Sequence, residues 1–171
     1  DDLTQAIALS PLRWGAYSDR GLADYQWSKY PSAVADFTRG INSDPRSLRG
    51  YYDRGLAYLK LAKFDLAIDD FSQALVISPT YSLAFAQRAA AYDAQGRFAQ
   101  ARADFDEALA LNANDAATYA ARAYSLYHLQ RYAEAIDDFT QAIALNAQEA
   151  NTYYGRALAY IHLNQADQAL P

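Results

Sequence analysis

The fold is decided by the stretch at residues 48–81, which reads LRGYYDRGLAYLKLAKFDLAIDDFSQALVISPTY. Small and apolar residues recur in it at three- and four-residue spacings, which indicates helix faces. One such face runs through residues 48–61 and another through residues 65–78, and Pro79 follows the second. Because proline cannot continue a helix, the pattern predicts two helices joined by a short connector and closed by Pro79.

The same pattern returns along the whole chain every 34 residues. The chain has 171 residues, which is five such periods and one further residue. Four columns repeat in register: Arg20, Arg54, Arg88, Arg122 and Arg156; Asp2, Asp36, Asp70, Asp104 and Asp138; Phe37, Phe71, Phe105 and Phe139; and the small residues Gly21, Gly55, Ala89, Ala123 and Ala157. A single helical hairpin cannot bury both of its faces, so successive hairpins must stack, and the repeat predicts an all-α solenoid.

These repeats resemble the tetratricopeptide repeat, in its bacterial type with Arg-Gly, Tyr and Asp-Phe positions. The resemblance implies one right-handed superhelix of about ten to eleven helices over residues 1–171. With Pro45 and Pro79 aligned to the closing proline of the family, the repeats follow in order: a half repeat at 1–13, full repeats at 14–47, 48–81, 82–115 and 116–149, and a truncated repeat at 150–171.

The composition argues against several classes of function. The chain has 15 basic and 20 acidic residues, so its mild negative charge does not favour nucleic-acid binding. It has no cysteine and no apolar run long enough to span a membrane. The sequence shows no glycine-rich phosphate loop and no nucleophile elbow, and the carboxylates lie at repeat positions. We therefore expect no catalytic residue, no cofactor, no metal, no nucleic acid and no membrane partner, and nothing indicates a compartment.

The arginine and aspartate columns allow two interpretations. One is a ladder of arginines for anionic ligands. The other is structural, because the two residues of a repeat lie at nearly the same level of an antiparallel hairpin. A partly buried guanidinium needs a carboxylate and meets it with two hydrogen bonds. We favour the structural interpretation, in which each arginine pairs with an aspartate of its own or the preceding repeat.

The resemblance implies that the first helices line a concave surface that binds a partner protein or peptide. The candidate groove residues are Tyr25, Arg49, Tyr52, Leu59, Lys60, Tyr127, His128, Tyr154 and His162. Tyrosine combines a large apolar ring with a polar tip, which suits protein contacts, although helical ring spacing is also typical of packing between helices. We expect the two histidines to be polar groove residues, since a closed zinc site needs further ligands. The leading hypothesis is a non-enzymatic interaction scaffold.

The two ends of the chain suggest an alternative. Asp1 and Pro171 occupy the same repeat position, inside a second helix. The apolar residues of these part-helices are Leu3, Ile7 and Leu9 at one end and Ala169 and Leu170 at the other. Either the chain is a fragment of a longer array, or copies stack head to tail and join the two part-helices into one. Such a contact is heterologous and need not close, so it predicts a self-assembling filament.

Overall fold

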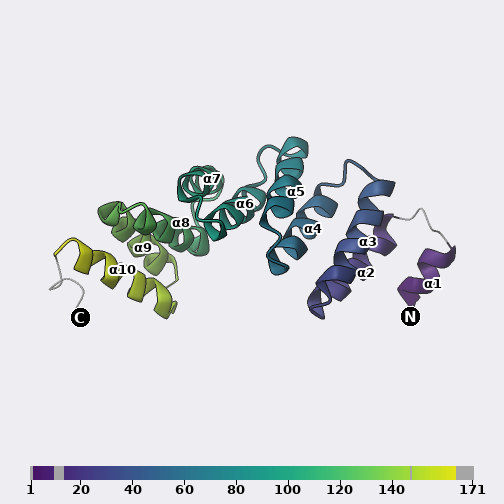
Figure 1. Cartoon of the computed structure of the whole chain (residues 1–171), viewed down its shortest axis with the longest axis horizontal. Helices are drawn as coiled ribbons and strands as arrows, with labels where there is room; N and C mark the ends of the chain where they lie inside the picture. Colours follow the sequence, from purple (N-terminus) through teal and green to yellow (C-terminus); the bar gives the residue numbers. More distant parts are fainter. Residues whose placement is uncertain (1, 10–13, 147, 165–171) are drawn as a thin grey trace. The chain divides into compact units, whose positions relative to one another are not determined.

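The structure is a computed structural model that describes residues 2–9, 14–146 and 148–164 (Figure 1). Every regular element within these ranges is a helix. The helices are α1 (Asp2–Leu9), α2 (Trp14–Gln26), α3 (Tyr30–Ser43), α4 (Leu48–Lys60), α5 (Phe64–Ile77), α6 (Ser82–Ala94), α7 (Phe98–Leu111), α8 (Ala116–His128), α9 (Tyr132–Leu145) and α10 (Ala150–His162). From α2 onward they alternate as the first and second helices of successive hairpins, as the repeat predicts.

Each first helix ends in the same way, with one residue in the left-handed conformation. The φ angles are 60° at Ser28, 53° at Ala62, 72° at Gly96, 59° at Gln130 and 56° at Asn164. After Ala62 the chain turns back, and the N–H of Lys63 donates to the carbonyl of Tyr58. This turn satisfies a carbonyl that the helix end would otherwise leave open. The connector therefore occupies residues 61–63, one residue earlier than the sequence predicts.

The second helices end where the prolines predict. Helix α5 ends at Ile77, and Ser78 caps it immediately before Pro79. The next first helix then begins after its own cap. At α4 the side chain of Ser47 accepts a hydrogen bond from the N–H of Gly50 at 3.0 Å, which satisfies one of the open donors of the first turn.

Contacts divide the chain into two compact units, residues 1–87 and residues 88–171. In the first unit the rings of Phe37 and Phe71 are buried. A Cβ atom added to Gly55 would lie 2.7 Å from the Phe71 ring, so glycine in the small-residue column lets this ring reach the backbone of α4. Helix α2 contacts both α3 and α4, so first helices of neighbouring repeats lie against each other here.

The second unit is built by the same rules. Phe105 and Phe139 are buried, and alanines occupy the small-residue column at Ala89 and Ala123. Helix α8 contacts α7, α9 and α10, so two first helices, α8 and α10, are again neighbours. Within each unit, neighbouring first helices therefore form a shared surface, made by α2 and α4 in the first unit and by α8 and α10 in the second.

Candidate functional site

The arginine column is a structural ladder, as predicted. Arg54 donates from Nε and Nη2 to the two carboxylate oxygens of Asp70 at 2.8 and 2.7 Å. The same two-bond pair joins Arg20 to Asp36, Arg88 to Asp104 and Arg122 to Asp138, always with the aspartate of the same repeat. The side chain of Asp70 is only 6% exposed. Such bidentate pairing fixes the first helix of a repeat to its second helix.

A third contact extends this ladder to the preceding repeat. The Nη1 group of Arg54 donates to the hydroxyl of Thr38 at 3.0 Å, and that of Arg122 donates to Asp106 at 2.7 Å. The hydrogen bonds that Arg54 donates to Asp70 favour the charged guanidinium and raise the pKa of Arg54 above its ordinary value. These guanidinium groups are engaged within the chain, so they do not form an open row for anionic ligands.

The groove candidates of the first unit lie on α2 and α4. Tyr25 is half-buried and packs edge-on against Tyr30 with ring centroids 5.4 Å apart. Tyr52 is also half-buried, and its ring contacts Tyr81 at 5.1 Å. The two cationic candidates, Arg49 and Lys60, are exposed, and Leu59 is half-buried.

Sequence reasoning missed a buried acid among these tyrosines, Asp53. This residue follows Tyr52 on α4 and is only 7% exposed. Its cationic partner among the described residues is Arg49, whose Nε lies 3.3 Å from Oδ2 of Asp53 and whose side chain is 64% exposed. A signal was available, because this repeat position holds Asp19, Asp53, Gln87, Ala121 and Gly155 in turn and is not a column of one residue type.

Burial and charge both act on these side chains. Burial raises the pKa of the Asp53 carboxyl above its usual 3.8, and Arg49 opposes that shift. Burial, then Tyr81 and Asp53, raise the pKa of Tyr52 to about 12. The pKa values of Tyr25 and Tyr81 are also raised, first by burial and in part by the charge of Asp53. The hydroxyls of Tyr25, from the preceding repeat, and of Tyr52 and Tyr81, from the same repeat as Asp53, therefore lie within the electrostatic reach of one carboxylate.

The groove candidates of the second unit form a cluster of stacked rings. His128 lies parallel to Phe98 with ring centroids 4.5 Å apart, and His162 lies parallel to Tyr132 at 4.7 Å. The Tyr127 ring packs edge-to-face with both imidazoles. Its centroid lies 5.9 Å from that of His128 and 5.4 Å from that of His162. The structure thus brings these three candidates together, while Tyr154 is 65% exposed on α10.

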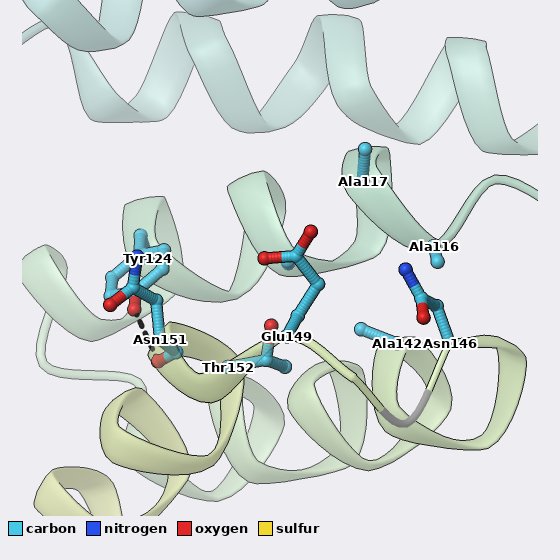
Figure 2. Close-up of a pocket in the computed structure, with 9 residues that line it drawn as sticks. Ala116, Ala117, Tyr124, Ala142, Asn146, Glu149, Asn151 and Thr152 are labelled. Carbon is cyan, nitrogen blue, oxygen red and sulfur yellow. Dashed lines mark hydrogen bonds between the residues drawn. The ribbon is translucent and has the colours of Figure 1, made fainter.

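A pocket of about 240 Å³ lies between α8 and α10 in the second unit (Figure 2). Small side chains of Ala116, Ala117, Ala120 and Ala142 line much of it, with Tyr124, Asn146, Glu149, Asn151 and Thr152. The hydroxyl of Tyr124 donates to the backbone carbonyl of Asn151 at 2.7 Å, which is the dashed bond in Figure 2. Tyr124 therefore joins the two first helices and forms one wall of the pocket.

The residues predicted at the two chain ends are described only in part. Leu9 ends α1 and is 84% exposed. Leu3 and Ile7 lie on α1, whereas Ala169 and Leu170 fall outside the described residues.

Two other kinds of site, a metal cluster and a membrane-spanning helix, are absent from residues 2–9, 14–146 and 148–164. No cluster of three or more histidine, cysteine, aspartate or glutamate side chains suited to a metal ion occurs in these ranges. No helix there has the length and apolar character needed to cross a membrane.

Comparison with known proteins identifies the class to which this architecture belongs. Family models described as tetratricopeptide repeat match residues 48–81, 82–115 and 116–148, which together are more than half of the chain. The chain therefore belongs to the tetratricopeptide repeat family, whose members are generally non-enzymatic scaffolds for protein–protein interaction. A comparison with curated protein sequences gave no match.

Solved structures share this fold. MamA has a TM-score of 0.85 at 19% identity, with 91% of this chain and 85% of the MamA chain covered. YrrB, a TPR protein with an unusual peptide-binding site, has a TM-score of 0.83 at 19% identity, with coverage of 99% and 88%. A tetratricopeptide repeat protein from Parabacteroides merdae has a TM-score of 0.82 at 20% identity, with coverage of 98% and 66%. At this identity the likeness shows the fold, an all-α solenoid.

Proposed function

We propose that the chain is a non-enzymatic scaffold that binds an extended segment of a partner protein on the tyrosine-rich surface of its first helices. The observation that carries this proposal is a difference in burial between the aromatic residues of the first and second helices. The phenylalanines of the repeated column on the second helices, Phe37, Phe71, Phe105 and Phe139, are buried as packing residues. The rings on the first helices are mainly tyrosines that stay accessible, half-buried at Tyr52 and Tyr127 and 65% exposed at Tyr154.

A half-exposed tyrosine contributes to binding more readily than to folding. Its ring offers a large contact area with few rotamers to immobilise, and its hydroxyl finds a hydrogen-bond partner in a peptide backbone. YrrB, a TPR protein of the same fold with an unusual peptide-binding site, supports the same use of this surface. The occupant we propose is therefore a peptide segment rather than a small molecule.

This function is tested with peptides selected on the chain itself. A random peptide phage library is panned against the wild-type chain, and the affinity of each selected peptide is measured by fluorescence anisotropy. Tyr154→Ser removes an exposed first-helix ring, and Leu145→Ser is the matched control, since Leu145 is 43% exposed on the second helix α9 of the same unit. We expect Tyr154→Ser to weaken peptides bound by the second unit by about tenfold or more.

The control defines how the experiment can fail. Leu145→Ser is expected to change those affinities by less than about threefold, because it alters the second-helix side. Equal losses in the two variants, or a selection that yields no binding peptide, would contradict the proposal.

A second candidate function is head-to-tail self-assembly, and Arg156 is the observation that favours it. The other four column arginines each donate to an aspartate. Among the described residues Arg156 has no carboxylate partner: it donates to the Thr140 hydroxyl at 3.2 Å and lies 5.6 Å from the centroid of the Tyr153 ring. The repeat position that should supply its carboxylate is the column to which Asp2 belongs, and Asp2 is exposed. A second copy stacked in register would bring its own Asp2 to Arg156 and restore the ladder across the joint.

A charge exchange tests this assembly. Arg156→Asp and Asp2→Arg are each expected to shift wild-type oligomers towards monomers in sedimentation velocity, and the double variant is expected to recover them. Arg46→Asp changes the charge by the same amount at an exposed residue and is the control. A monomeric wild-type chain at the highest attainable concentration would rule out the filament.

A further inference from the structure

Asp53 is a buried charge that the repeat architecture does not require. The same repeat position holds an exposed aspartate at Asp19 and apolar residues at Ala121 and Gly155. Taking a carboxylate out of water costs free energy unless a well-placed cation compensates it. A residue that carries this cost at a single repeat is therefore a candidate for function.

The compensation that Asp53 receives inside the chain is weak. Arg49 reaches it with one hydrogen bond of 3.3 Å, one helical turn away, from a side chain that is 64% exposed. The ladder aspartate Asp70, in the same repeat, receives two bonds of 2.7 and 2.8 Å from an arginine that is 17% exposed. Because the Arg49 guanidinium lies mostly in solvent, water screens its charge, and burial remains the larger influence on the Asp53 carboxyl.

The surroundings of Asp53 suit a positive charge that comes from outside. Tyr25 belongs to the preceding repeat, and Tyr52 and Tyr81 belong to the same repeat as Asp53. All three are half-buried in the first unit, and the ring centroids of Tyr52 and Tyr81 are 5.1 Å apart. The charge of Asp53 acts on all three hydroxyls. Aromatic rings attract cations through their faces, and a buried carboxylate adds a direct ionic partner.

We propose that Asp53, Tyr25, Tyr52 and Tyr81, here called the Asp53 site, bind a positively charged side chain, lysine or arginine, of the partner peptide. Arg49 holds Asp53 until the peptide binds, and the incoming cation displaces it. This inference rests on the proposed function, because it names the side chain that the first unit recognises within a bound segment.

The test uses synthetic fluorescein-labelled peptides with one variable central residue, Ala-Leu-Ala-Lys-Ala-Leu-Ala and its counterparts with norleucine or glutamate in place of lysine. Norleucine keeps the aliphatic stem and removes the charge. Fluorescence anisotropy is measured with the wild-type chain at low ionic strength. We expect the lysine peptide to bind about tenfold or more tightly than the norleucine peptide, and the glutamate peptide to bind most weakly.

Two variants and a matched control separate this site from general electrostatic attraction. Asp53→Asn keeps the shape of the side chain and is expected to remove the preference for lysine. Asp19→Asn makes the same change at the same repeat position, where the aspartate is exposed, and is expected to keep that preference. Arg49→Ala removes the competing cation and is expected to strengthen lysine-peptide binding several-fold. Circular dichroism confirms that each variant is folded.

The outcomes distinguish failure of this inference from failure of the proposed function. If the lysine and norleucine peptides bind the wild-type chain equally, or if Asp53→Asn keeps the preference, the Asp53 site is not a cation site, although the groove still binds peptides. If the lysine peptide binds the Arg49→Ala variant more weakly than the wild-type chain, the cation of the peptide does not displace Arg49. If no peptide binds at millimolar concentration, both proposals fail.

Discussion

Two buried aspartates in one repeat, Asp70 and Asp53, have opposite relations to their surroundings. Asp70 lies on the second helix and accepts two hydrogen bonds from Arg54, which in turn reaches Thr38 of the preceding repeat. Asp53 lies on the first helix and has one longer bond from the exposed Arg49. Burial raises the pKa of both carboxyls and an arginine opposes each shift, but the guanidinium that pairs with Asp70 is 17% exposed and the one that pairs with Asp53 is 64% exposed.

The difference teaches how a repeat protein separates structure from recognition. The arginine–aspartate pair occurs in every full repeat, because in each repeat the first helix must pack on the second helix and on the neighbouring repeat. Among the described residues, a buried aspartate on a first helix occurs at Asp53 alone, as expected for a residue that recognises a ligand at one place on the array. Features that are constant along the period therefore report architecture, and features that break the period report candidate function.

The largest expected effect comes from breaking the ladder. Arg54→Ala leaves Asp70 buried without its guanidinium, and we expect the free energy of unfolding to fall by about 3–5 kcal/mol. Equilibrium urea denaturation followed by circular dichroism measures this loss. Arg39→Ala is the control, because Arg39 also pairs with a ladder aspartate, Asp36, but its side chain is 59% exposed. That control is expected to cost less than about 1 kcal/mol, and similar losses in both variants would refute the structural role of the ladder.

The next largest effect is the difference in stability between the asparagine variants of the two aspartates. Asp70→Asn is expected to lower the free energy of unfolding by about 2–4 kcal/mol, because Arg54 loses its ionic partner while it remains buried. Asp53→Asn is expected to be neutral or stabilising within about 1 kcal/mol, because it removes a poorly compensated buried charge. Both variants are measured in urea at neutral pH. If Asp53→Asn destabilises as much as Asp70→Asn, then Asp53 is a structural residue.

Much of the fold and the ladder could be predicted from the sequence, because the repeat states each of them several times. Arg54 and Asp70 recur at fixed spacing, and antiparallel hairpin geometry brings them to one level. Pro79 placed the end of α5 correctly for a local reason, the missing N–H. The connector begins one residue earlier than the sequence predicts. The chain turns at Ala62 in the left-handed conformation, which alanine does not favour, so local residue preference gave no signal for a turn there.

The candidate site could be predicted only in part. Tyr52 and Tyr127 were predicted as groove residues from the resemblance to the tetratricopeptide repeat. Asp53 was not predicted, because its repeat position does not keep one residue type. Its burial, to 7% exposed, follows from how the helices pack, which the recurrence of residue types does not state. A sequence pattern gives the residue at each position, whereas the burial of its charge is a tertiary property.

A smaller effect follows from the pKa of Asp53, which burial raises above its usual 3.8. The folded state therefore binds this proton more tightly than the unfolded state, so the contribution of Asp53 to stability falls as pH rises from the unfolded pKa to the folded one. Asp53→Asn removes this dependence. The stability of the variant relative to wild type should increase as pH rises through that window and then level off. Urea denaturation across a pH series measures it, and Asp19→Asn is the control.

The smallest effect is on the ionisation of Tyr52, whose pKa is about 12. Burial is the main cause and the charge of Asp53 is a lesser one, so Asp53→Asn should lower the pKa of Tyr52 slightly and leave it well above the usual 10.0. Ultraviolet absorbance of tyrosinate follows this titration, and Tyr52→Phe identifies the step that belongs to Tyr52. A return of the pKa to 10.0 would mean that charge dominates over burial, and no change would place Asp53 too far from the hydroxyl to act in the same site. A slight decrease is the result that joins the ring and the carboxylate as parts of one cation-binding surface.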